Sequence, residues 1–178
     1  GFNRYEALRS FRRAAELDPQ AVMPLWGAAM SLSPHINMDG DGDVNLAMAC
    51  EYLAKARTLL ASAPDDERAF IEAARTRCPG GNPQAYITAM RGVMQRFPDD
   101  LDAATLYAEA VMVPVRWRWW SRDGVPAAGM TAAVSALEAA LRRSPQHLGA
   151  NHYYIHAVEA SPTPERAKAS TANEPTPP

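Results

Sequence analysis

The stretch AVSALEAALRRSP, residues 133–145, decides the fold because its spacing occurs three times in the chain. Small or apolar residues stand at relative positions 0, 4 and 7, and a proline stands at position 12. The first three offsets place side chains on one face of a helix, and proline, which lacks a backbone N–H, marks where that helix has ended. The other copies are ALRSFRRAAELDP at 7–19 and YITAMRGVMQRFP at 86–98.

The composition predicts a folded, soluble protein. Of the 178 residues, 47% are hydrophobic and 21% are charged, which argues against intrinsic disorder. The net charge of −2 lacks the clustered basic character that nucleic acids and anionic membranes select. No apolar run approaches the ~20 residues that span a bilayer, and no leader opens the chain. We therefore expect a cytoplasmic protein with no nucleic-acid or membrane partner.

The two cysteines, Cys50 and Cys78, lie in predicted helices and form no CxxC spacing. This pattern favours two buried, reduced thiols over a zinc site or a disulfide-rich scaffold. A single disulfide between them is the alternative.

The helical periodicity covers almost the whole chain. It predicts a single helical-repeat domain over 1–169, with an irregular insertion at 113–128 and a disordered, proline-rich tail at 170–178. Asp43 is the predicted cap of the third helix. Helices are expected at 3–17, 21–32, 44–61, 65–77, 83–97, 100–112, 130–143 and 148–160.

The repeated offsets, each followed by a second apolar helix, resemble tetratricopeptide repeats. More closely, the chain resembles the N-terminal half of a group of bacterial tetratricopeptide-repeat proteins of unassigned function. The resemblance implies an all-α fold of about four divergent repeats, in which antiparallel helix pairs stack into a right-handed superhelical solenoid. The matching residues are Tyr5-Glu6-Ala7, Phe11, Ala14, Asp18-Pro19, Trp26-Gly27, DLDAATLYAEA at 100–110 and GANHYYIHAVEA at 149–160.

The resemblance also implies an interaction module that binds a peptide or a partner protein in its groove. First helices of each pair would line that groove and present Trp26, Tyr107, His152 and Tyr153. A helix left unpaired at either end would expose apolar surface, so we also expect the chain to bind itself through its terminal helices.

One predicted helix face carries a set of metal-ligating residues. His152, His156 and Glu159 fall at i, i+4 and i+7, and His147 lies one turn earlier. Two imidazoles and a carboxylate are typical ligands of a transition metal such as Zn²⁺. The alternative function is therefore a metal-dependent hydrolase of small esters, lactones or amides that uses His147, His152, His156 and Glu159. His152, His156 and Glu159 would be its catalytic residues, and His35 and the loop at 39–43 are candidates for further ligands. The competing interpretation is that these side chains only bond neighbouring helices.

A second candidate ion site is the loop NMDGDGDVN at 37–45, which alternates oxygen-bearing side chains as a calcium loop does. Asn37, Asp39, Asp41 and Asp43 would be the Ca²⁺ ligands. The twelfth position of such a loop, which needs a glutamate, is Met48, so only a looser Ca²⁺-stabilised site or an exposed turn remains possible.

The insertion contains the run RWRWW at 116–120. Tryptophan and arginine dominate binding hot spots, so Trp117, Trp119 and Trp120 are candidate ligand-binding residues. The competing interpretation is that these rings hold the insertion against the helices.

Overall fold

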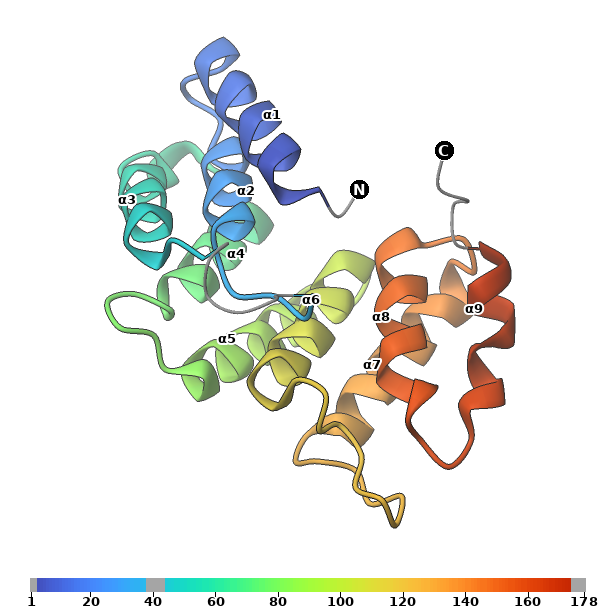
Figure 1. Ribbon diagram of the computed structural model, residues 1–178. Helices are drawn as coiled ribbons and strands as arrows, with labels where there is room; N and C mark the ends of the chain where they lie inside the picture. Colours follow the sequence, from blue (N-terminus) through green and yellow to red (C-terminus); the bar gives the residue numbers. More distant parts are fainter. Residues whose placement is uncertain (1–2, 38–43, 174–178) are drawn as a thin grey trace. The chain divides into compact units, whose positions relative to one another are not determined.

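The computed structural model describes residues 3–37 and 44–173, with side chains through residue 170, and the regular elements in these ranges are all helical (Figure 1). None of the helices in that part of the chain is long and apolar enough to cross a membrane. The α-helices are α1 (Arg4–Leu17), α2 (Met23–Ser31), α3 (Leu46–Arg57), α4 (Asp65–Arg75), α5 (Pro83–Arg96), α6 (Leu101–Met112), α7 (Met130–Arg143), α8 (Leu148–Glu159) and α9 (Lys168–Asn173).

Two compact units make up the chain, unit 1 over Gly1–Ala89 and unit 2 over Met90–Pro178. The boundary between them falls inside α5. Three short 3-10 helices lie beside the α-helices: η1 (Leu60–Ser62) in unit 1, and η2 (Val113–Val115) and η3 (Pro164–Ala167) in unit 2.

Polar residues just before the helices fix where several of them begin. Asn3 accepts the Glu6 backbone N–H at 3.1 Å, and Asp100 accepts that of Ala103 at 3.1 Å. The cap of α3 is Asn45, whose side chain accepts the Met48 N–H at 3.0 Å. The prediction that Asp43 caps this helix was wrong, because the helix begins two residues later than the spacing suggested and Asn45 also has a cap-forming side chain.

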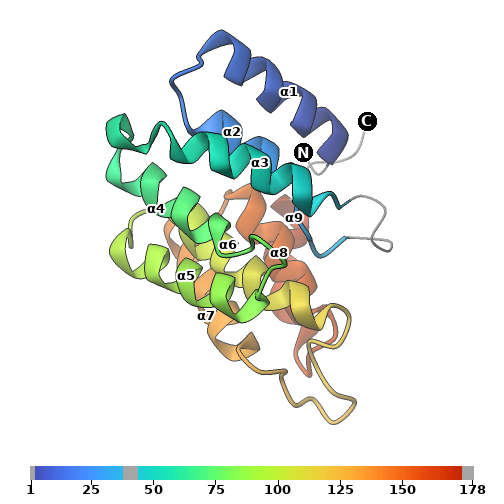
Figure 2. The same cartoon turned by 90° about the vertical axis from the view of Figure 1, so that its left-hand side faces the viewer.

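Unit 1 is built around α2, which packs against α1, α3 and α4. In both cartoon views α2 lies between α1 and α3 (Figure 2). Trp26 contacts both parts of the core and meets Phe70 edge to face, with 5.7 Å between ring centroids. The buried core residues are Val22, Leu25, Ala56, Leu60, Ala63 and Ile71 in one cluster and Ala29, Leu32, Ala49, Leu53 and Ala74 in the other.

Close approach between α1 and α2 depends on a glycine. A Cβ atom built on Gly27 would lie 2.4 Å from the ring of Phe11, which fills that space. Arg4 joins the same two helices at their other end, because its guanidinium donates to the carbonyl oxygens of Met30, Ser31 and Ser33. These carbonyls lie at or just beyond the C-terminal end of α2, where carbonyl groups lack the usual helical partners four residues on.

Gly27→Ala should therefore destabilise the protein by about 1–3 kcal/mol, the usual cost of overpacking. Gly92→Ala is the matched control, since a Cβ there meets nothing within 4 Å and alanine favours a helix by about 1 kcal/mol. Urea unfolding followed by circular dichroism measures both. A Gly27→Ala protein as stable as the Gly92→Ala protein would show that Phe11 does not need this space.

A disulfide joins Cys50 of α3 to Cys78, three residues beyond the end of α4. The two Cα atoms lie 5.8 Å apart, and no free cysteine is present in the described chain. The prediction of reduced thiols was wrong, because packing α3 against α4 brings together two residues 28 positions apart. Disulfides persist in oxidising compartments, so this bond weighs against the predicted cytoplasmic location, which stays a prediction.

Removing this bond by replacing Cys50 and Cys78 with serine should lower the stability by about 3–4 kcal/mol, from the entropy of an open loop of this length. Wild-type protein treated with a reductant should lose the same stability, which thermal unfolding measures as a lower melting temperature. The oxidised protein should release no thiol when it is denatured. Equal melting temperatures with and without reductant would contradict this prediction.

Unit 2 follows a similar packing pattern, in which α7 packs on α6 and α8, α8 also contacts α6, and α9 packs on α8. Its core includes Tyr107, Met112, Met130, Leu137 and Val158. The predicted insertion forms η2 and an irregular loop closed by an isolated bridge between Trp120 and Pro126. Of the predicted tail at 170–178, residues 170–173 lie in α9, and 174–178 lie outside the described residues.

Candidate tryptophan–histidine site

The histidines of α8 separate into two environments. His147 caps the helix, and its Nδ1 accepts the Ala150 backbone N–H at 3.1 Å. An accepting Nδ1 leaves the proton on Nε2, which lies 3.3 Å from a carboxylate oxygen of Asp102. Both ring nitrogens of His147 therefore have partners, and neither partner is one of the other three predicted ligands.

His152, His156 and Glu159 do come together, as the helical spacing predicted. The two imidazole centroids lie 4.8 Å apart, with their planes at 78°. Nδ1 of His156 lies 3.0 Å from Oε1 of Glu159. Within the described ranges, no group of three or more His, Cys, Asp or Glu side chains is arranged to hold a metal ion. The Zn²⁺ site stays a prediction.

The environment of His152 keeps its ring uncharged. Burial and, to a smaller extent, the neighbouring His156 lower the pKa of His152 to about 4, although the Glu159 carboxylate acts in the opposite direction. At neutral pH the ring is therefore a neutral imidazole.

The tryptophan insertion folds onto this helix. The Trp120 indole N–H donates to the Ala157 carbonyl of α8 at 2.7 Å. Trp119 is buried, and its indole N–H donates to the Met112 carbonyl at 2.9 Å. Backbone bonds from Ala127 to Trp119 and from Ser121 to Val125 close the loop that carries them. Trp119 and Trp120 thus hold the insertion in place.

Trp117 has the opposite character, because 61% of its surface is exposed. Its backbone φ is 61°, in the left-handed region that costs a residue other than glycine about 1–3 kcal/mol. The ring centroid lies 5.2 Å from that of Trp119 and 6.1 Å from that of His156. We call the set Trp117, Trp119, His152, Tyr153, His156 and Glu159 the tryptophan–histidine cluster.

Other predicted binding residues lie elsewhere. Trp26 belongs to the core of unit 1, and Tyr107 is 1% exposed beneath Arg91, which donates to its hydroxyl at 3.2 Å. His35 is buried, and Asn37 is exposed. The proposed calcium ligands Asp39, Asp41 and Asp43 lie outside the described residues, so the Ca²⁺ site stays a prediction.

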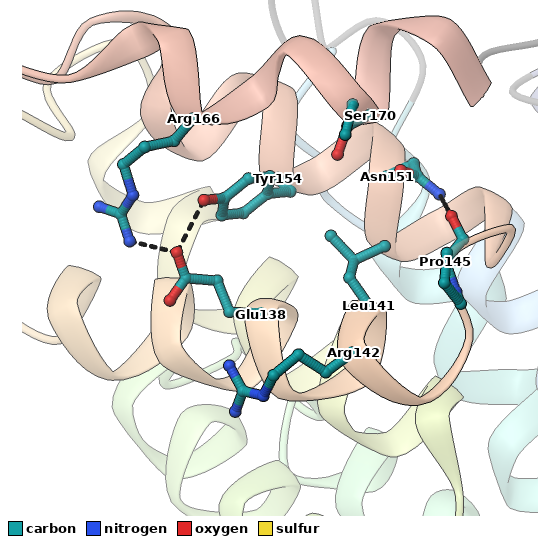
Figure 3. Close-up of a pocket in the computed structure, with 9 residues that line it drawn as sticks. Glu138, Leu141, Arg142, Pro145, Asn151, Tyr154, Arg166 and Ser170 are labelled. Atoms are coloured by element: carbon teal, nitrogen blue, oxygen red, sulfur yellow. Dashed lines mark hydrogen bonds and ion pairs between the residues drawn. The ribbon is translucent and has the colours of Figure 1, made fainter.

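A pocket of about 460 Å³ in unit 2 was not predicted. Figure 3 shows its wall, where Glu138 of α7 accepts from the Tyr154 hydroxyl of α8 at 2.7 Å and pairs with Arg166 of η3. Burial and the bond to Glu138 raise the pKa of Tyr154 to about 12. The sequence contains one sign of this pocket, which is that Glu138 is a charged residue beside the apolar face of the helix at 133–145. The pocket is lined by Glu138, Leu141, Arg142, Pro145, Asn151, Tyr154, Arg166, Ala169 and Ser170.

Comparison with known proteins gives no match of significance, whether to protein-family models, to curated proteins or to solved structures.

Tyr154→Phe should cost about 1–2 kcal/mol, because it removes a hydrogen bond to a charged group while Arg166 still pairs with Glu138. The Tyr154 pKa is raised on folding, so this contribution is complete below pH ~10, the pKa of an unfolded tyrosine. It is lost as the pH rises toward about 12.

Tyrosinate absorbance during an alkaline titration measures this effect directly. The titration should contain a late step near pH 12 from Tyr154, and Tyr154→Phe should remove that step. Tyr52→Phe, at a half-buried ring of unit 1, is the control and should leave it in place. A wild-type titration with no late step would contradict the assignment.

Proposed function

We propose that this protein is a helical-repeat interaction module that binds a peptide segment of a partner protein at the tryptophan–histidine cluster. The packing within each unit supports a stack of repeats. Within α1–α4 and within α6–α8, each helix contacts the next along the chain, and α2 also touches α4 as α6 touches α8. Contacts limited to near neighbours are typical of helical solenoids.

Trp117 is the observation that carries the proposal. A ring of this size normally contributes to folding by burial, yet most of this one faces solvent on a backbone that costs free energy to hold. Folding of unit 2 does not require such an arrangement. Binding does, since exposed tryptophan is the side chain most enriched among interface hot spots.

The side chains that support the Trp117 ring, Trp119 and His156, are held in place. Trp119 is buried and hydrogen-bonded, and the His156 ring contacts both indoles. A ring supported in this way loses little freedom when a partner covers it, and preorganisation of that kind raises affinity. The cluster is therefore suited to hold one apolar or aromatic side chain of a peptide.

The charge of the insertion indicates the rest of the peptide. Segment 116–123 carries three arginines and one aspartate in a chain whose net charge is −2. Arg118 and Arg122 are exposed. Acidic residues flanking the apolar anchor would therefore be attracted to the insertion.

The other expected activities stay predictions. Self-association would use α1, which leaves 73% of Tyr5 and 69% of Leu17 exposed. The hydrolase alternative would rely on His152, His156 and Glu159 without His147. Neither self-association nor hydrolysis is supported by a feature as unusual as the exposed ring of Trp117.

The test selects short peptides from a displayed random library on the wild-type protein and measures their affinity by fluorescence anisotropy. Trp117→Ala should weaken binding by at least about tenfold, as expected for a hot spot. Val125→Ala is the matched control, because Val125 lies in the same insertion with the same 61% exposure. It should bind as the wild type does.

Circular dichroism should show that both variants keep their helices. Selected peptides should be rich in aromatic and acidic residues. A library that yields no binder, or peptides that bind the Trp117→Ala variant equally well, would contradict the proposed function.

A further inference from the structure

The two histidines of the cluster form a pair on one helix turn. His152 and His156 are four residues apart on α8, so their side chains lie above one another on the same face. Their ring centroids are 4.8 Å apart, so the two imidazoles are direct neighbours.

Glu159 fixes the chemical form of one ring. An ionised carboxylate only accepts hydrogen bonds, so the 3.0 Å contact places the His156 proton on Nδ1. The lone pair of that ring is then on Nε2. Around protein-bound zinc and related metals, a histidine typically donates the N–H of one ring nitrogen to a carboxylate and binds the metal through the other nitrogen.

We propose that His152 and His156 bind one divalent transition-metal ion, of the class that includes Zn²⁺, Ni²⁺ and Cu²⁺, and that Glu159 orients His156 without binding the ion. Imidazole nitrogen suits these metals, and water would complete the coordination. The rings now stand edge to face at 78°, so the His152 ring turns about its Cβ–Cγ bond when the ion binds. The metal site shares residues with the proposed peptide-binding cluster, but its argument does not rest on peptide binding.

The proposal gives different roles to the four predicted ligands. His147 is excluded, because its nitrogens serve the helix cap and Asp102. Glu159, predicted as a ligand, is here an orienting residue, because its carboxylate accepts a hydrogen bond from the protonated nitrogen of His156.

Trp117 and Trp119 supply a local reporter, since each ring centroid lies 6.1 Å from that of His156. Protein without a polyhistidine tag is titrated with Cu²⁺ while tryptophan fluorescence is followed. Bound Cu²⁺ should quench this fluorescence, and Zn²⁺, which does not quench, should reverse the effect by competition. Equilibrium dialysis with elemental analysis should give one Cu²⁺ per chain at the quenching site.

Variants separate the roles. His152→Ala and His156→Gln should each weaken Cu²⁺ binding by at least about tenfold, whereas His147→Ala should bind as the wild type does. Glu159→Gln should keep one ion per chain but lower the affinity by about 10- to 100-fold, as loss of an orienting carboxylate does. His156→Gln keeps a side chain of comparable length in the place of a ring that is only 20% exposed.

Electron paramagnetic resonance of the Cu²⁺ form should show two imidazole nitrogens as ligands. Quenching that survives in both His152→Ala and His156→Gln, or an equal loss in His147→Ala, would overturn the site. A single imidazole ligand in the resonance spectrum would do so as well. Unchanged affinity in Glu159→Gln would overturn the role given to Glu159.

Discussion

The hydrogen bond from the Trp120 indole to the Ala157 carbonyl is the contact on which the candidate site depends. It joins residues 37 positions apart and attaches an irregular loop to the last long helix of unit 2. Together with the ring contacts of Trp117 and Trp119 to His156, it sets the position of the insertion on α8. With it, Trp117 and Trp119 lie against the His156 ring, and one surface combines an exposed indole with a pair of imidazoles.

The helices could be predicted from the sequence because they depend on local rules. Apolar offsets of 0, 4 and 7 and the following proline predicted the helices beginning at Arg4, Pro83 and Met130 to within a few residues. Helix starts were less certain where two capping residues compete, as Asp43 and Asn45 did. The all-α class follows from these rules, whereas the superhelical stack depends on interhelical angles that no local pattern contains.

The site was predicted in parts but not as a whole. The spacing of His152, His156 and Glu159 on one helix face is a local property, and it was predicted. The meeting of that face with the insertion is not local, because Trp120 is separated from α8 by the whole of α7. The Cys50–Cys78 bond and the Glu138–Tyr154–Arg166 network also join distant segments. No spacing rule predicts such pairs.

The disulfide has a consequence for the integrity of unit 1 that concerns covalent topology. The chain between α3 and α4 passes through η1 and carries exposed residues such as Ala61 and Ser62, where proteases usually cut. A single cut there would leave the two halves of unit 1 connected through sulfur. The core that Trp26 shares with Phe70 would then remain assembled around a broken backbone, and only reduction would release the pieces.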